Sequence, residues 1–231
     1  MKPGELERVQ PTSDAPRVGN AYLLRGFIGI WSYGIDDLGG KINAAGIRAS
    51  VFQEDQWHAL AETIIEKYRN EPRHEPIVLI GHSYGADDTL RIARQLKECS
   101  IPVDLIITLD PVTPPKVPDS VHFCYNFYQS NLLDSLPFFR GIPLESEAPK
   151  GANLQNMDLR TDRRDLLEPG TDHFNIEKNQ KVHAEIVKKL QEVCLPRDVW
   201  LMQKYGMLDG SSPSTSGKPS PTPLSQYDRI P

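Results

Sequence analysis

Residues 81–85 read Gly-His-Ser-Tyr-Gly, so Ser83 has a glycine two positions away on each side. The apolar run 76–80 before it is typical of a buried strand, and residues 86–98 have the pattern of a helix. A serine at such a junction sits on a sharp turn that lifts its hydroxyl above the sheet. The flanking glycines let backbone approach closely, and the following helix N-terminus favours negative charge. We therefore predict that Ser83 is a nucleophile.

A serine hydroxyl is a weak nucleophile without a positioned base, which is normally a histidine oriented by a carboxylate. His173 lies in a loop between the last predicted strand, 154–159, and the last predicted helix, 175–193. Loops of this kind converge on the ligand crevice of an open α/β sheet. We predict His173 as the base. Structural or solvated positions are predicted for the other histidines, which are His58, His74, His82, His122 and His183.

Asp110 is the first candidate for the acid because it ends the strand that follows the Ser83 helix. It should therefore leave the sheet at the same edge as Ser83. Pro111 is expected to restrict Asp110 to extended backbone and to end the strand there. Asp134, after the next predicted strand, is the alternative acid, and Asp172 is a weaker third candidate.

A tetrahedral oxyanion needs two backbone N–H donors. Tyr84 follows the nucleophile and is predicted to supply one of them. The segment Gly26-Phe27-Ile28-Gly29 follows the first predicted strand, and Phe27 is predicted to supply the other.

Strands and helices must alternate to position these residues. The predicted strands are 21–24, 48–53, 76–80, 103–109, 121–128 and 154–159, and the predicted helices are 35–45, 56–68, 86–98 and 175–193. This alternation predicts an α/β fold, a mostly parallel sheet of about six strands with helices on both faces. The continuous apolar runs within 76–80 and 105–109 suit strands that are buried on both sides.

Composition suggests three regions along the chain. Residues 1–19 contain three prolines among polar residues and are expected to form a flexible arm. Residues 20–208 are expected to form the folded domain. Residues 209–231 are rich in Pro and Ser, which predicts a disordered tail.

Charge and motifs narrow the function classes. The net charge of −5 and the pI near 5.7 argue against nucleic acid or an anionic membrane as the main partner. The sequence shows no apolar run of transmembrane length and no signal peptide at its start, so a cytoplasmic location is expected unless a leader has been removed. Neither the three cysteines nor any other motif has the spacing of a metal, nucleotide or dinucleotide site, so no cofactor is expected.

Over roughly residues 20 to 195, the sequence resembles the α/β-hydrolase superfamily, particularly its lipase, esterase and thioesterase branch. The order Ser83, Asp110, His173 matches the family's order of nucleophile, acid and base. The string Leu109-Asp110-Pro111 is similar to pancreatic-type lipases, which have their acid at this position, whereas most members have it after the next strand.

The sequence also departs from this family. Arg25-Gly26 stands where lipases usually have His-Gly, and the first two family strands are absent. The connection from Pro111 to Val121, where many relatives insert a cap domain, is short. The resemblance therefore implies a minimal fold without a cap domain.

Together these features predict a serine hydrolase that cleaves a carboxylic ester or thioester through an acyl-enzyme on Ser83. An apolar acyl group would suit the residues expected to line a cleft, which are Phe27, Ile30, Trp31, Tyr33, Tyr84 and 132–139. One alternative is an acyltransferase or thioesterase that acts on carrier-bound acyl groups, with Arg160, Arg163 and Arg164 as a basic patch. Another is a non-catalytic binding protein with a hydrolase fold. The sequence fixes neither the substrate nor the oligomeric state.

Overall fold

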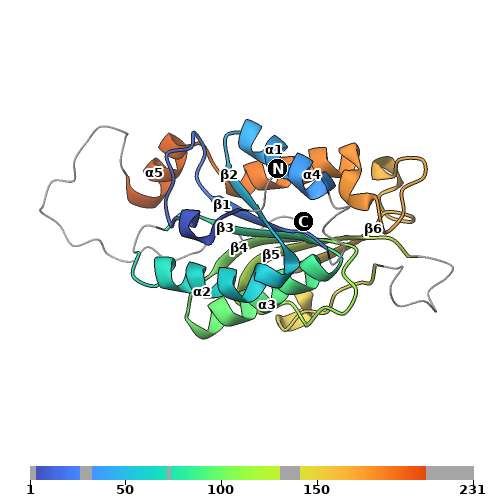
Figure 1. The fold of residues 1–231 in the computed structure, drawn as a ribbon, viewed down its shortest axis with the longest axis horizontal. Helices are drawn as coiled ribbons and strands as arrows, with labels where there is room; N and C mark the ends of the chain where they lie inside the picture. Colours follow the sequence, from blue (N-terminus) through green and yellow to red (C-terminus); the bar gives the residue numbers. More distant parts are fainter. Residues whose placement is uncertain (1–3, 27–32, 72–73, 131–140, 207–231) are drawn as a thin grey trace, which may run out of the picture. The chain divides into compact units, whose positions relative to one another are not determined.

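A six-stranded parallel sheet forms the centre of the computed structural model, which describes residues 4–26, 33–71, 74–130 and 141–206. Its strand order is β2-β1-β3-β4-β5-β6, and every neighbouring pair is parallel (Figure 1). The strands are β1 (Asn20–Leu24), β2 (Arg48–Phe52), β3 (Ile77–His82), β4 (Val103–Leu109), β5 (Val121–Tyr128) and β6 (Leu154–Asp158). The prediction of a mostly parallel sheet of about six strands is confirmed.

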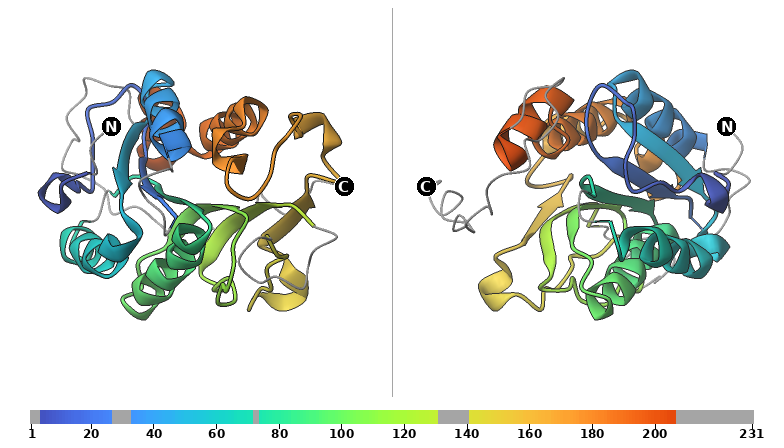
Figure 2. Two further views of the ribbon diagram at one scale, coloured as in Figure 1. Left: turned by 45° about the vertical axis from the view of Figure 1, so that its right-hand side comes forward. Right: turned by 90° about the vertical axis from the view of Figure 1, so that its left-hand side faces the viewer.

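Helices cover both faces of the sheet (Figures 1 and 2). One face packs against α1 (Tyr33–Ala44) and α4 (Gln180–Val193), and the other packs against α2 (Trp57–Tyr68) and α3 (Tyr84–Glu98). Along β3, Leu79 belongs to the α2 and α3 side, whereas Val78 and Ile80 belong to the α1 and α4 side. Because successive side chains of a strand point to opposite faces, a strand buried on both faces must be apolar throughout.

Each predicted helix start differs from the observed one, by one or two residues in α1, α2 and α3 and by more in α4. The predicted helix 175–193 begins as a separate 3-10 turn at Ile176–Lys178, and α4 starts only at Gln180. The Asn179 side chain accepts the N–H of Val182 at 3.0 Å and so caps α4, which is why the helix cannot begin earlier. Helix α3 starts at Tyr84, two residues before the predicted start. The remaining short 3-10 helices are Leu6–Arg8, Glu54–Gln56, Pro149–Gly151 and Arg164–Leu166.

The chain divides into two units, residues 1–197 and residues 198–231. The second unit contains most of α5 (Arg197–Tyr205), in which the Trp200 and Tyr205 rings lie 5.6 Å apart. The predicted domain limit at 208 and the tail 209–231 lie outside the described residues. Of the helices that the structure describes, none combines the length and apolar character that crossing a bilayer requires.

Residues 4–19, expected to form a flexible arm, are tied to the sheet domain by buried contacts. Val9 and Val18 are buried. The buried carboxylate of Glu75 accepts the N–H of Gly19 at 2.8 Å and pairs with Arg197 at 2.6 Å. Glu75 therefore holds both ends of the first unit together, a role that the prolines and polar residues of this segment did not indicate.

Replacement of Glu75 by Ala should lower the free energy of unfolding by roughly 3 kcal/mol, because it leaves Arg197 without its buried partner. Urea denaturation of the full chain measures this change. Glu192→Ala, at a half-exposed side chain, is the matched control and should change stability by less than about 0.5 kcal/mol. Equal stability of the two variants would contradict this account of the N-terminal segment.

Candidate active site

The register of the central strands brings Ser83 and Asp110 to one edge of the sheet. His82 of β3 pairs with Leu109 of β4, so the next residue of each strand leaves the sheet at the same level. The Ser83 N–H donates to the Leu109 carbonyl at 2.9 Å, which continues the ladder into the turn. This carboxyl edge is where ligands bind in open α/β sheets.

Ser83 has φ 56° and ψ −125°, a backbone conformation that few non-glycine residues adopt. Close packing of the turn enforces it. A β-carbon on Gly81 would overlap the Gly85 carbonyl, and one on Gly85 would overlap the Arg25 carbonyl and lie 2.6 Å from that of Leu24. The two glycines are therefore required by the close approach of β1 and of the turn itself.

The His173 imidazole lies between Ser83 and Asp110. Its Nε2 is 3.2 Å from Ser83 Oγ, and its Nδ1 is 3.5 Å from Asp110 Oδ2. Because a carboxylate can only accept, Nδ1 carries the proton and Nε2 accepts from the hydroxyl. The contact to Asp110 is longer than a good hydrogen bond. All three residues are buried.

Asp110 is completely buried and has φ 46°. The expectation that Pro111 would keep it extended is therefore wrong. Contacts on either side of Asp110 fix this conformation: its N–H donates to Phe127 O at 2.9 Å, and its Oδ1 accepts the Gln129 N–H at 2.7 Å. Aspartate tolerates positive φ better than most residues.

Asp87 holds the chain segment that follows Asp110 against α3. It is buried in the first turn of α3, and its carboxylate accepts the N–H groups of Val112 at 3.0 Å and Thr113 at 2.8 Å. Burial raises the pKa of this carboxyl, and the two backbone donors oppose that rise. Helix α3, which follows Ser83, and the loop after Asp110 are thus held together by one side chain.

His82, which precedes Ser83 in the Gly-His-Ser-Tyr-Gly turn, is hydrogen-bonded to the His173 loop. Its Nε2–H donates to the His173 carbonyl at 2.8 Å, and the two rings are 5.3 Å apart. Burial lowers the pKa of His82 to about 3, so the ring stays neutral near pH 7. Its predicted structural role agrees with this contact.

Tyr84 directly follows Ser83 and is the first residue of α3, so its backbone N–H belongs to the first turn of that helix. Gly26 approaches from the end of β1, where an added β-carbon would lie 3.1 Å from Ser83 Cβ. Arg25 forms a buried ion pair with Asp36 at 2.7 Å. Phe27 and Asp134, the predicted second oxyanion donor and alternative acid, lie outside the described residues.

Glu177 joins the His173 loop to the start of α1. Its carboxylate is completely buried near the backbone of Gly34, where an added β-carbon would overlap it. Burial raises the pKa of Glu177 to about 7, and the backbone N–H groups of Gly34 and Ile35 oppose the rise. The His173 loop and the start of α1 are therefore packed against each other.

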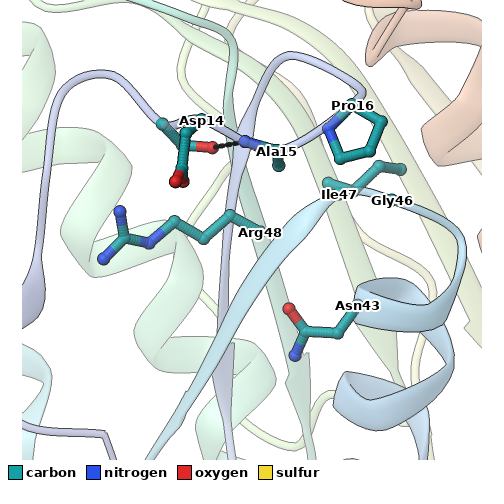
Figure 3. A pocket seen from close by; sticks show the side chains of 8 residues that line it. Asp14, Ala15, Pro16, Asn43, Gly46, Ile47 and Arg48 are labelled. Carbon is teal, nitrogen blue, oxygen red and sulfur yellow. Dashed lines mark hydrogen bonds between the residues drawn. The ribbon is translucent and has the colours of Figure 1, made fainter.

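A hollow of about 290 Å³ lies elsewhere, near the amino end of β2 (Figure 3). Asp14 and Arg48 border it, and Asn43 already bonds the backbone of Ala49 through both its oxygen and its nitrogen. It is thus at the edge of the sheet opposite to Ser83 and is separate from the candidate site.

A family model described as a thioesterase domain matches residues 48–122, which include the Ser83 turn and Asp110. This match supports the resemblance to α/β-hydrolases over that segment, and with it an ester or thioester hydrolase. No curated protein matches the sequence.

Three solved structures are among those similar to this chain. Est1E from Butyrivibrio proteoclasticus is 12% identical, with 79% of this chain and 91% of that chain covered and a TM-score of 0.48. A cutinase-like protein from Cryptococcus sp. is 14% identical, with 78% and 96% covered and a TM-score of 0.46. A putative α/β-superfamily hydrolase from Xanthomonas campestris pv. campestris is 15% identical, with 74% and 98% covered and a TM-score of 0.39. None of these similarities identifies a substrate.

Gly85→Ala should destabilise the protein by more than about 2 kcal/mol, because the new methyl group overlaps two carbonyl oxygens of the β1 end. Gly40→Ala in α1 is the matched control. A β-carbon there meets no atom within 4 Å, so helix propensity should make this variant neutral or about 0.5–1 kcal/mol more stable. Thermal and urea unfolding compare the two, and a neutral Gly85→Ala would refute the packing argument.

Glu177→Gln should change the pH dependence of stability. A carboxyl whose pKa rises from 4.5 to about 7 on folding stabilises the native state at low pH and loses that contribution as pH rises through about 7. Relative to the unmodified protein, the Gln variant should therefore gain about 2 kcal/mol between pH 5 and pH 8. Urea unfolding across this range measures the gain. Glu192→Gln should show no such trend, and a flat difference for Glu177→Gln would contradict the assignment.

Proposed function

We propose that this protein is a serine hydrolase that cleaves a carboxylic ester or thioester through an acyl-enzyme on Ser83. The observation that supports it most is the buried contact of 3.2 Å between Ser83 Oγ and His173 Nε2, with Asp110 on the far side of the ring. The thioesterase-domain match over residues 48–122 supports the reaction class.

In the proposed reaction, Ser83 Oγ attacks the carbonyl carbon while His173 Nε2 takes the hydroxyl proton. Asp110 stabilises the imidazolium that forms. The N–H groups of Tyr84 and Phe27 are the proposed donors to the tetrahedral oxyanion. The intermediate then collapses, the bond to the alcohol or thiol breaks, and His173 returns its proton to that leaving group. Water activated by His173 next attacks the acyl-enzyme and releases the acid.

An apolar acyl group fits the described rim of the site. Phe174, next to the proposed base, is 51% exposed, and its ring lies 5.6 Å from that of His173. Tyr33, at the start of α1, is 60% exposed. Because its ring lies beside that of the proposed base, we assign Phe174 a contact to the substrate, and Tyr33 stays a second candidate from the predicted cleft lining.

A free small-molecule substrate is favoured over an acyl group on an acidic carrier. Arg163, central to the candidate basic patch, pairs with Asp165 at 2.8 Å and with Glu185 at 3.4 Å. Arg160 is half-buried and donates to Gln129 at 3.2 Å. These internal contacts reduce the positive charge that the patch presents to an acidic surface.

Ser83→Ala should lower kcat for a short aryl ester and for an acyl-thioester by about 10³-fold or more while leaving the fold intact. Hydrolysis assays, thermal unfolding and labelling with a fluorophosphonate probe measure this together. Ser50→Ala, a half-buried serine of β2, is the matched control and should keep both activity and labelling.

Comparison of kcat/KM for esters and for thioesters of increasing acyl length then shows which of these two substrate classes the protein prefers. Undiminished hydrolysis by Ser83→Ala would reject the acyl-enzyme. An unmodified protein that neither hydrolyses these compounds nor reacts with the probe would instead be the non-catalytic binding protein.

A further inference from the structure

Gln129 lies beside the proposed acid, although the reaction described above assigns it no role. It directly follows β5, and its side chain is buried. Leu109 of β4 pairs with Phe127 of β5, so the chain positions that leave the two strands are neighbours at the carboxyl edge. The register therefore puts Gln129 against Asp110.

Gln129 donates to both oxygens of the Asp110 carboxylate. Its main-chain N–H reaches Oδ1 at 2.7 Å, and its side-chain Nε2 reaches Oδ2 at 3.3 Å. Oδ2 is also the atom that faces His173 Nδ1 at 3.5 Å. The side-chain amide thus acts on the same oxygen that would orient the imidazole.

Arg160 determines which way the Gln129 amide points. Its Nη2 donates to Gln129 Oε1 at 3.2 Å. A guanidinium can only donate, so the amide oxygen must face Arg160 and the amide nitrogen must face Asp110. Tyr128 of β5 pairs with Asp158 of β6, and this register brings the residues that follow both strands together.

Asp110 needs such donors because it is completely buried. A carboxylate in a medium of low dielectric is costly unless hydrogen bonds compensate its charge, and donors at fixed positions also restrict its rotation. Gly141 closes the remaining side, where a β-carbon would overlap Oδ1.

The geometry points to Gln129 as the positioning residue for the acid of the proposed triad, with Arg160 holding its amide in the required orientation. This inference rests on the proposed function. Gln129 is assigned no contact with the substrate. Its whole effect on the reaction comes from the position in which it holds the Asp110 carboxylate.

A double-mutant cycle tests this dependence. Gln129→Met keeps the side-chain length and the main-chain donor but removes the amide, so kcat for a short ester should fall about tenfold, the equivalent of one charged hydrogen bond. KM should stay within about twofold because no substrate contact is lost. In an Asp110→Asn background, Gln129→Met should have no further effect on kcat, since its route to the chemistry is already removed.

Arg160→Met provides a second test that leaves Gln129 in place. It should lower kcat about threefold, and that loss should vanish when Gln129→Met is already present. It also keeps the inference testable should Gln129→Met fail to fold.

Asn153→Leu is the matched control. Asn153 is another buried amide, whose nitrogen donates to the carbonyls of Pro118 and Val121 at 2.9 Å each. Its loss should lower the unfolding temperature without lowering kcat of the folded protein.

Two results would overturn the inference: a folded Gln129→Met variant with unchanged kcat, or equal losses from Gln129→Met with and without Asp110. Both presuppose an unmodified protein whose hydrolysis depends on Ser83. Failure of that requirement would reject the proposed function itself, so the two failures are distinguishable.

Discussion

The close approach between the Ser83 turn and the end of β1 is the constraint on which the rest of the site depends. It requires a position without a β-carbon at Gly85, whereas Gly81 is required by close packing within the turn, and Ser83 has a positive φ. The turn packs against the backbone of Leu24 and Arg25, and α3 starts immediately after the serine. The same contact brings Gly26, and with it the chain that leaves β1, next to the Ser83 side chain.

Parallel register then supplies the remaining polar groups. Strands β3, β4, β5 and β6 end side by side along one edge, and a polar residue of the site or its support follows each strand, directly after β3, β4 and β5 and two positions after β6. Ser83, Asp110, Gln129 and Arg160 arise in this way. A parallel sheet with matched strand lengths therefore produces a row of neighbouring side chains from segments far apart in the sequence, without any long excursion of the chain.

Sequence reasoning located the strands and most helices because the sheet is buried on both faces, which leaves apolar runs such as 105–109. It also selected Ser83, Asp110 and His173, which the structure places within contact distance, although their catalytic roles remain proposals. Gln129 gave no such signal, because a lone glutamine after a strand has no motif, and only the register reveals its neighbour. The positive φ of Asp110 was missed for a similar reason. The preference that Pro111 imposes is local, whereas the bonds that override it come from β5.

Two of the three residues in the proposed triad are held at positive φ, and this bears on how the site works. A strained backbone persists only where its surroundings determine it from several sides. Ser83 is fixed by glycine packing and by its N–H bond to Leu109, and Asp110 by its bonds to Phe127 and Gln129. In the proposed reaction, each would therefore already be in place, so little reorganisation would be needed when charge develops. His173 is the member on a loop rather than at a strand end, and its carbonyl is tied to His82 of the same turn that carries Ser83. The position of His173 is thus tied to that of Ser83 through the His82 hydrogen bond, and a movement of the His173 loop would first lengthen its distance to Asp110, which is the longest contact of the set.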